Sequence, residues 1–291
     1  MIPLLLFVNI ILFFTLRKNS LIVKEAMQFM VDTTNQTRYN ILYSKKKEGC
    51  IIELQPNSFS LEQTTVWSFP DRGKWATHSG RYRGNWSPYI PRNLILRYSK
   101  PGDWILDQFL GSGTTLVEAK LLNRNAIGID INSRSVSLSE ANLNFECDTQ
   151  SQIFIKNGNA TDLSFIKNEK IDFICTHPPY ADIIKYSNRI EGDLSLLNTT
   201  MFFEEISKVA TESYRVLKKG KCCAVMMGDK RYQGNVVPLG FQLMQTFINV
   251  GFKIKEIIIK EQHNCKSTDK WINVERNFLI LAHEYIFVFY K

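Results

Sequence analysis

The segment Thr176-His177-Pro178-Pro179-Tyr180 is the part of the chain whose residue types are most suited to chemistry. Two consecutive prolines fix the backbone and direct carbonyl oxygens outward, and Tyr180 offers a flat surface for a base. The exocyclic amine of a base is a poor nucleophile because its lone pair is conjugated with the ring. Acceptors such as the His177 side chain and the Pro178 carbonyl would favour a pyramidal, reactive nitrogen. His177, Pro178, Pro179 and Tyr180 are therefore the predicted catalytic residues, although Pro-Pro-Tyr alone is also typical of a Pro-rich loop.

A glycine-rich segment, 107–115, is the second candidate site. Gly111 and Gly113 permit close approach of the backbone to a ligand, and the following helix offers free N–H groups to a carboxylate. Leu116 occupies the position of a third glycine, and no Gly-Lys-Ser/Thr follows, so a pyrophosphate site is disfavoured. Asp130, at the end of the next apolar run, is placed to bind the ribose of an adenosine ligand. Asn159 could meet the adenine amine, and a plain turn explains it nearly as well.

Apolar runs and amphipathic segments predict the elements that position these motifs. They alternate as strands and helices, which predicts a doubly wound α/β fold with a mostly parallel sheet of about seven strands. The last two strands are expected to form an antiparallel pair at one edge. Ligands bind such sheets at the carboxyl ends of the strands. The strands are expected at 104–109, 126–131, 153–156, 171–175, 221–227, 252–259 and 284–290, and the helices at 93–98, 115–122, 136–145, 201–217 and 237–250.

Charge and cysteine usage narrow the class of partner. Lys and Arg total 36 against 28 Asp and Glu, for a formal charge of +8. This balance favours a polyanion, and solubility explains it about as well. The six cysteines show no Cys-x-x-Cys spacing and no matched His pair. The sequence therefore predicts no metal site and a reducing, cytoplasmic location.

The first residues form an unusual apolar stretch. Residues 2–16 are almost continuously apolar and precede Arg17 and Lys18, but they are too short to span a bilayer and lack signal-peptide features. An appendage read from an upstream start codon is favoured over a short membrane anchor or a packed helix. We therefore divide the chain into an appendage (1–26), an N-terminal segment in which aromatic and cationic residues alternate and could contact a polyanion (27–100) and a catalytic domain (101–291). Residues 229–275 are the candidate target-recognition region.

The two motifs together resemble those of the amino-methyltransferases of DNA, and the resemblance covers roughly residues 37–291. These enzymes carry a Phe-x-Gly-x-Gly cofactor motif and an Asp/Asn/Ser-Pro-Pro-Tyr/Phe catalytic motif. The resemblance implies a Rossmann-like methyltransferase fold with S-adenosyl-L-methionine as cofactor, and base flipping in duplex DNA. It implies that residues 177–180 hold the target base and that Asp130 binds the ribose. The remaining cofactor residues would be Asp107, Phe109, Gly111, Gly113, Thr114 and Thr115.

His177 stands where that family has Ser, Asp or Asn. Serine is associated with cytosine and Asp or Asn mainly with adenine, while a neutral imidazole can still accept a hydrogen bond. The segment 67–98, which includes 83–92, resembles the one that precedes the cofactor motif in that family and touches the methionine end of the cofactor. The resemblance is in particular to cytosine-N4 methyltransferases of restriction–modification systems, so cytosine N4 is the preferred target and a cognate endonuclease a possible partner. Adenine N6, guanine N2 of RNA and a non-catalytic DNA-binding protein are the alternatives. Carbon-5 methylation of cytosine is disfavoured because no Pro-Cys dipeptide occurs.

Overall fold

The computed structural model describes residues 40–41, 53–264, 274–275 and 277–291. The apolar stretch 1–26 lies outside the described residues. No helix in the described part of the chain is long and apolar enough to cross a membrane.

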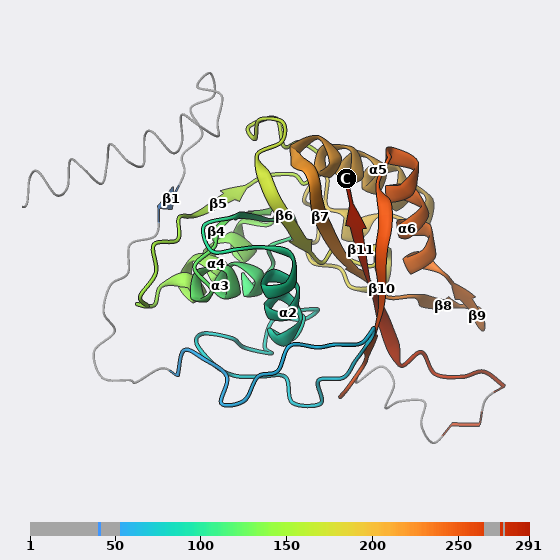
Figure 1. The fold of residues 1–291 in the computed structure, drawn as a ribbon. Helices are drawn as coiled ribbons and strands as arrows, with labels where there is room; N and C mark the ends of the chain where they lie inside the picture. The colour runs from blue at the N-terminus through green and yellow to red at the C-terminus, as the bar shows by residue number, and fades with distance from the viewer. Residues whose placement is uncertain (1–39, 42–52, 265–273, 276) are drawn as a thin grey trace, which may run out of the picture.

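A mixed sheet forms the centre of the molecule, with the strand order β1-β5-β4-β3-β6-β7-β11-β10-β2 (Figure 1). Order along the chain reverses between β3 and β6, which is the switch point where such sheets bind ligands. Five adjacent strands are parallel to one another: β3 (Trp104–Asp107), β4 (Asn125–Asp130), β5 (Ile153–Asn157), β6 (Ile171–Thr176) and β7 (Leu217–Met227). The predicted doubly wound, mostly parallel α/β fold is confirmed.

The far side of the sheet differs from the prediction in one respect. β10 (Lys253–Glu261) and β11 (His283–Tyr290) are antiparallel, as expected. However, β11 lies inside the sheet, between β7 and β10. Residues 284–289 are all buried, whereas much of β10 is exposed. A strand that is apolar on both faces is stable only where both faces are covered, so β11 takes the inner position. The two-residue strands β1 (Asn40–Ile41) and β2 (Val66–Trp67) flank the sheet.

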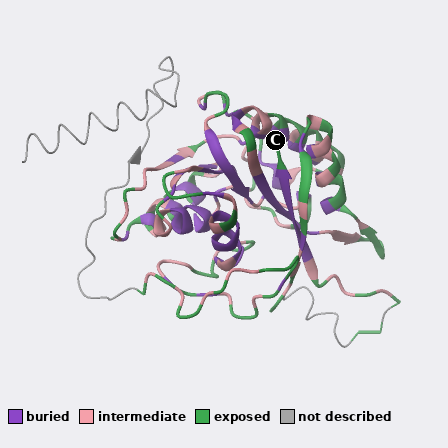
Figure 2. Ribbon diagram, in the orientation of Figure 1, coloured by how far each residue is buried: buried purple, intermediate pink, exposed green. Residues whose placement is uncertain are grey.

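Helices cover both faces of the sheet, and the strand side chains alternate between the two layers. One layer contains α2 (Tyr89–Tyr98), α3 (Thr114–Leu121) and α4 (Ser133–Leu143), and its core takes Ile286 and Val288 of β11. The other contains α5 (Thr199–Val216) and α6 (Leu239–Val250), and its core takes Phe287 and Phe289. Figure 2 shows that the central strands are buried between these layers.

Two local features were not expected from the sequence. Helix α2 begins at Tyr89 and contains Pro91, so it begins four residues before the predicted helix at 93–98. Proline is tolerated there because the N–H groups of a first helical turn have no partner in the helix. A short hairpin joins β8 (Lys230–Tyr232) to β9 (Asn235–Val237) through Gln233 and Gly234, both at positive φ. Residues 229–275 thus contain this hairpin together with α6 and β10, which are parts of the main α/β layers.

Candidate active site

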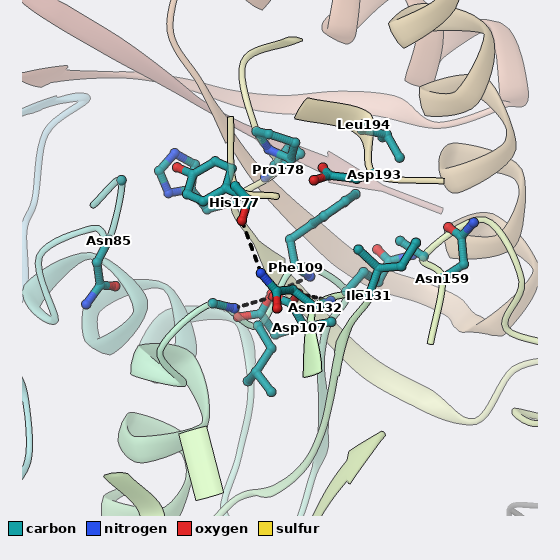
Figure 3. Close-up of a pocket in the computed structure, with 18 of the residues that line it drawn as sticks. Asn85, Asp107, Phe109, Ile131, Asn132, Asn159, His177, Pro178, Asp193 and Leu194 are labelled. Carbon is teal, nitrogen blue, oxygen red and sulfur yellow. Dashed lines mark hydrogen bonds between the residues drawn. The ribbon is translucent and has the colours of Figure 1, made fainter. Parts of the chain in front are cut away.

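The carboxyl ends of β3, β4 and β6 open into a cavity that we call the inner pocket. Figure 3 shows His177 and Pro178 above Phe109 and Asp107 in this pocket. The glycine turn and the diproline segment therefore contribute to one cavity. Its walls are formed by Tyr82, Gly84, Asn85, Trp86, Asp107, Gln108, Phe109, Leu110, Gly111, Asp130, Ile131, Asn132, Asn159, Ala160, His177, Pro178, Pro179, Tyr186, Gly192, Asp193 and Leu194.

Asp130 fastens the glycine turn to the end of β4. Its carboxylate accepts hydrogen bonds from the Gly111 N–H at 2.9 Å and the Asn132 N–H at 2.8 Å. The Leu110 N–H adds a bond of 2.9 Å to the Ile129 carbonyl. Burial raises the pKa of Asp130 to about 6, against the opposing effect of these N–H donors. The acid is thus held rigidly at the pocket wall and is mainly ionised at neutral pH.

Asp107 joins the ends of β3 and β6. Its carboxylate accepts from the Thr176 hydroxyl at 2.8 Å and the Phe109 N–H at 3.1 Å. The Thr176 hydroxyl oxygen in turn accepts from the Gln108 N–H at 3.2 Å. Burial raises the pKa of Asp107 to about 6. These bonds fix the distance between the two strand ends that carry the motifs.

Three of the predicted cofactor residues, Gly113, Thr114 and Thr115, do not line the inner pocket. Gly113 has φ 83° and begins α3, where an added Cβ would lie 3.1 Å from the side chain of Ser139. The Thr114 hydroxyl donates to the Asn85 side chain at 2.7 Å, and Thr115 is fully buried. These residues support the turn from behind.

The pocket also uses residues that sequence reasoning did not single out. Tyr82 and Tyr186 stack with ring centroids 6.1 Å apart, and Asn132 donates to the Tyr186 carbonyl at 3.1 Å. Asn132 caps α4 by accepting from the Arg134 N–H at 3.0 Å, a pattern that a helix-start search of the sequence would have found. Nothing in the sequence around Tyr186 or Asp193 marks either residue.

A second cavity of about 1070 Å³, which we call the outer cleft, lies next to the inner pocket. Six residues besides His177 line both cavities: Gly84, Asn85, Trp86, Pro178, Pro179 and Tyr186. We call these seven residues the shared wall. Tyr180 lines the outer cleft only. The cleft is lined by four cationic side chains, Arg72, Lys230, Arg231 and Lys260, by three acidic ones, Asp182, Asp229 and Glu284, and by His263. Lys230 pairs with Asp182 and Lys260 pairs with Glu284.

A chain of hydrogen bonds runs from the shared wall into the sheet. His177 stacks on Trp86, with ring centroids 5.4 Å apart and an interplanar angle of 23°. Its Nε2 lies 2.8 Å from the Tyr180 hydroxyl, which donates to Glu284 Oε1 at 2.8 Å. Lys260 Nζ donates to the other Glu284 oxygen at 2.9 Å. Glu284 and Lys260 were absent from the predicted site.

Burial and neighbouring charges shift the pKa values of the residues in this hydrogen-bonded series. Desolvation lowers the pKa of His177 to about 4, so the imidazole is neutral at pH 7. Burial and the nearby Glu284 raise the pKa of Tyr180 well above its usual value. Burial alone would raise the pKa of Glu284. The charge of Lys260 and the hydrogen bonds that the Glu284 carboxylate accepts from Lys260 and Tyr180 outweigh burial and leave this pKa below its ordinary value. At neutral pH Glu284 is therefore a carboxylate, Tyr180 a neutral phenol and His177 a neutral imidazole.

The sheet order and the pocket at its switch point, with a glycine turn and an acid on the adjacent strand, define a Rossmann-like α/β fold with a ligand site at the carboxyl ends of its strands. The model of the DNA methylase family matches residues 8–141 and 171–291, so the chain belongs to that family. This confirms the predicted family. A second family model, the RMKL-like methyltransferase domain, matches residues 94–230. Among the described residues no group of three His, Cys, Asp or Glu side chains could hold a metal ion.

Known relatives match short parts of the chain. A tRNA (guanine(10)-N2)-dimethyltransferase of Methanothermobacter thermautotrophicus is 38% identical over 100 residues, which are 34% of this chain and 29% of the relative. The Type II methyltransferase M2.DpnII of Streptococcus pneumoniae is 41% identical over 76 residues, 26% of this chain and 27% of the relative. The aligned part thus spans less than a third of either relative.

Solved structures of methyltransferases also resemble the chain. An S-adenosylmethionine-dependent methyltransferase of Methanosarcina mazei aligns with a TM-score of 0.45 and 19% identity, covering 68% of this chain and 96% of that chain. A methyltransferase of Pyrococcus furiosus aligns with a TM-score of 0.47 and 15% identity, covering 74% and 87%.

Proposed function

We propose that this protein transfers a methyl group from S-adenosylmethionine to an exocyclic amine of DNA, with cytosine N4 as the preferred target and adenine N6 as the alternative. The observation that carries the proposal is the shared wall. His177 and Pro178, the candidate acceptors for the amine, line both a pocket suited to the methyl donor and a wide cleft with Lys and Arg side chains that could meet nucleic acid.

The inner pocket fits S-adenosylmethionine by the chemistry of its walls. Asp130 and Asp193 supply acceptors for ribose hydroxyls or an ammonium group, and Asn159 has a polar edge for the adenine. Ile131, Ala160 and Leu194 offer apolar surface for the adenine ring. Tyr82 and Tyr186 place aromatic faces near a sulfonium, which is a cation attracted to such faces. A side chain at Gly84 would meet the Tyr186 hydroxyl at 1.9 Å, so the wall has no room for one.

The outer cleft fits a flipped nucleotide and its strand. Its volume of about 1070 Å³ exceeds the space needed for one base, and enzymes that modify a base must first remove it from the stack. Cations along the cleft would neutralise backbone phosphates. The β8–β9 hairpin borders the cleft and exposes 64% of Tyr232, which could contact bases or sugar.

At the shared wall, protein acceptors would hold the amine for attack. S-adenosylmethionine, when bound, supplies a methyl group on a positively charged sulfur. The Pro178 carbonyl and a neutral His177 accept hydrogen bonds from the amine, so its lone pair is freed toward the methyl. Methyl transfer would form the N–C bond as the S–C bond breaks, and the amine proton would become acidic only then. That proton would leave through its acceptor to solvent. The low pKa of His177 keeps this acceptor neutral at physiological pH.

A second candidate is methylation of a guanine N2 in RNA. The similarity to a tRNA dimethyltransferase and the match to the RMKL-like domain support it. The match to the DNA methylase family covers more of the chain and favours DNA. Similarity to Type II methyltransferases further suggests sequence-specific methylation, in the cytoplasm, beside a cognate restriction endonuclease.

Nucleoside mass analysis tests these assignments. The protein is incubated with methyl-labelled S-adenosylmethionine and either unmethylated genomic duplex DNA or unmodified tRNA, and the products are digested to nucleosides. We expect N4-methylcytosine from DNA. N6-methyladenine would select the alternative base, and methylguanine from tRNA alone would select the second candidate. No labelled nucleoside from either substrate would overturn the proposal. The variant His177→Ala, once circular dichroism has verified that it is folded, should have a rate lower by about 100-fold or more.

A further inference from the structure

We infer that Glu284 and Lys260 act as positioning residues, which hold His177 through Tyr180 in the tautomer with Nδ1 as its acceptor. The inference rests on the proposed function in one point only, namely that the target amine is the group that donates a hydrogen bond to Nδ1. The tautomer itself is a property of the protein alone and can be measured without substrate.

The chain of bonds begins with a fixed acceptor. Glu284 is buried on β11, with 8% of its surface exposed, and stands directly opposite Lys260 on β10 in the strand register. Lys260 donates to Oε2 at 2.9 Å and its charge keeps the pKa of Glu284 low. An ionised carboxylate can accept hydrogen bonds but cannot donate one. Glu284 Oε1 is therefore an acceptor.

The direction of the next two bonds follows from this acceptor. Tyr180 has a single hydroxyl proton, and that proton lies toward Glu284 Oε1 at 2.8 Å. The hydroxyl oxygen can therefore only accept in its 2.8 Å contact with His177 Nε2. A neutral imidazole carries one N–H, so the proton is on Nε2 and Nδ1 has the free lone pair.

The remaining contacts of His177 leave Nδ1 available. Trp86 covers one face of the ring, and Tyr180 occupies Nε2. Nδ1 has no hydrogen-bond partner among the described residues, and the side chain lines both cavities. The other tautomer would place an N–H at Nδ1, and a donor there would repel the N–H₂ group of a target base. The Glu284–Lys260 pair thus determines whether His177 assists the amine or opposes it.

This account gives Tyr180 a role that stacking on the base does not require. In the stacking role the aromatic ring is sufficient, and Tyr180→Phe retains activity. In the positioning role the hydroxyl is essential, because it relays the orientation of Glu284 to His177. Tyr180→Phe separates the two roles with a change of one oxygen atom.

Nitrogen NMR of the full-length protein, labelled with ¹⁵N in its histidines, reads the tautomer directly. The His177 signals are assigned by their loss in His177→Gln. We expect protonated Nε2 and unprotonated Nδ1 at pH 7.5, and a shift toward a mixture of tautomers in Tyr180→Phe and Glu284→Gln. A wild-type His177 protonated on Nδ1, or a tautomer that is unchanged in both variants, would overturn the inference.

Methylation kinetics provide the second readout. Tyr180→Phe should lower kcat about tenfold, the effect of one lost hydrogen bond, with KM for DNA nearly unchanged. Glu284→Gln should have a smaller effect in the same direction, because its amide oxygen can still accept from Tyr180. Tyr285→Phe is the matched control, since its hydroxyl contacts His283 at 3.0 Å in a similar Tyr–His pair. Wild-type kcat in Tyr180→Phe contradicts the inference. Absence of methylation by the wild type would contradict the proposed function instead. The NMR measurement of the tautomer needs no substrate and would still test the inference.

Discussion

The inner pocket and the outer cleft share a wall but are assembled from different kinds of contact. In the inner pocket, each acid accepts from a backbone N–H two residues away in sequence, from Phe109 for Asp107 and from Asn132 for Asp130, and Asp107 also accepts from Thr176 on a neighbouring strand. The outer cleft depends on side chains far apart in sequence. Tyr180 and Glu284 are 104 residues apart, and the bond of 2.9 Å between Ser68 and His263 spans 195 residues.

The two cavities also differ in electrostatic character. Burial raises the pKa of both Asp107 and Asp130 to about 6, so these acids ionise at neutral pH at some cost to folding. The inner pocket is lined by acids without Lys or Arg, whereas the outer cleft has Lys and Arg side chains beside its acids. Acids suit a cationic sulfonium donor and cations suit a phosphate backbone. We therefore expect substitutions in one cavity to affect one ligand and leave the other nearly unchanged. Asp130→Asn and Arg83→Gln test this separation, and Asp107→Asn tests the cost of the buried acids to folding.

The largest expected effect is that of Asp130→Asn on cofactor affinity. An asparagine can accept only through its oxygen, so its NH₂ group would face the N–H of Gly111 or Asn132. We expect the Kd for S-adenosylmethionine to rise about 10- to 100-fold, as for a lost hydrogen bond to a charged group. Isothermal titration calorimetry measures this change, and fluorescence anisotropy should show DNA affinity within about twofold of wild type. Asp148→Asn, in an exposed turn, controls for charge. An unchanged cofactor Kd would remove Asp130 from the donor site.

Asp107→Asn is expected to stabilise the protein in a pH-dependent manner. The folded-state pKa of about 6 lies above the ordinary value of 3.8, so ionisation destabilises the fold as pH rises through 6 and has no cost below about 4. The shift corresponds to on the order of 3 kcal/mol, part of which the weaker hydrogen bonds of asparagine will offset. We expect Tm at pH 8 to rise by roughly 4 °C and the gain to vanish near pH 4. Calorimetry at several pH values measures this, with Asp148→Asn again as control. A loss of Tm at pH 8 would contradict the expected sign.

The smallest effect is expected from Arg83→Gln at the rim of the outer cleft. Arg83 is exposed and directly precedes Gly84 of the shared wall. Loss of one phosphate contact should weaken DNA binding a few-fold and reduce the salt slope by about one, without changing the Kd for S-adenosylmethionine. Lys219→Gln removes an exposed cation at the beginning of β7, at the opposite end of the sheet, and should leave the slope unchanged. Equal slopes for both variants would show that DNA does not cross this rim.

The same contrast explains how much of the molecule could be predicted from sequence. The glycine turn, Asp130 and the diproline step are local patterns at strand ends, and all of them contribute residues to the inner pocket. The apolar run of β11 also indicates that this strand is buried on both faces, but the sequence does not indicate which strands lie on either side of it. Glu284 was missed because a single acid in an apolar strand gains meaning only from Lys260 and Tyr180, and no spacing links the three. The prediction for residues 1–26 concerns a part of the chain outside the described residues.

The internal position of β11 has a consequence for the order in which the sheet can form. β10 precedes β11 along the chain but pairs with it and not with β7. During synthesis, β10 therefore has no place in the main sheet until β11 has been made. Such non-local pairing slows folding. The part of the sheet that ends at β7 can form first, together with the glycine turn. Because Glu284 lies on β11, the hydrogen bonds that hold His177 through Tyr180 can form only when β11 inserts.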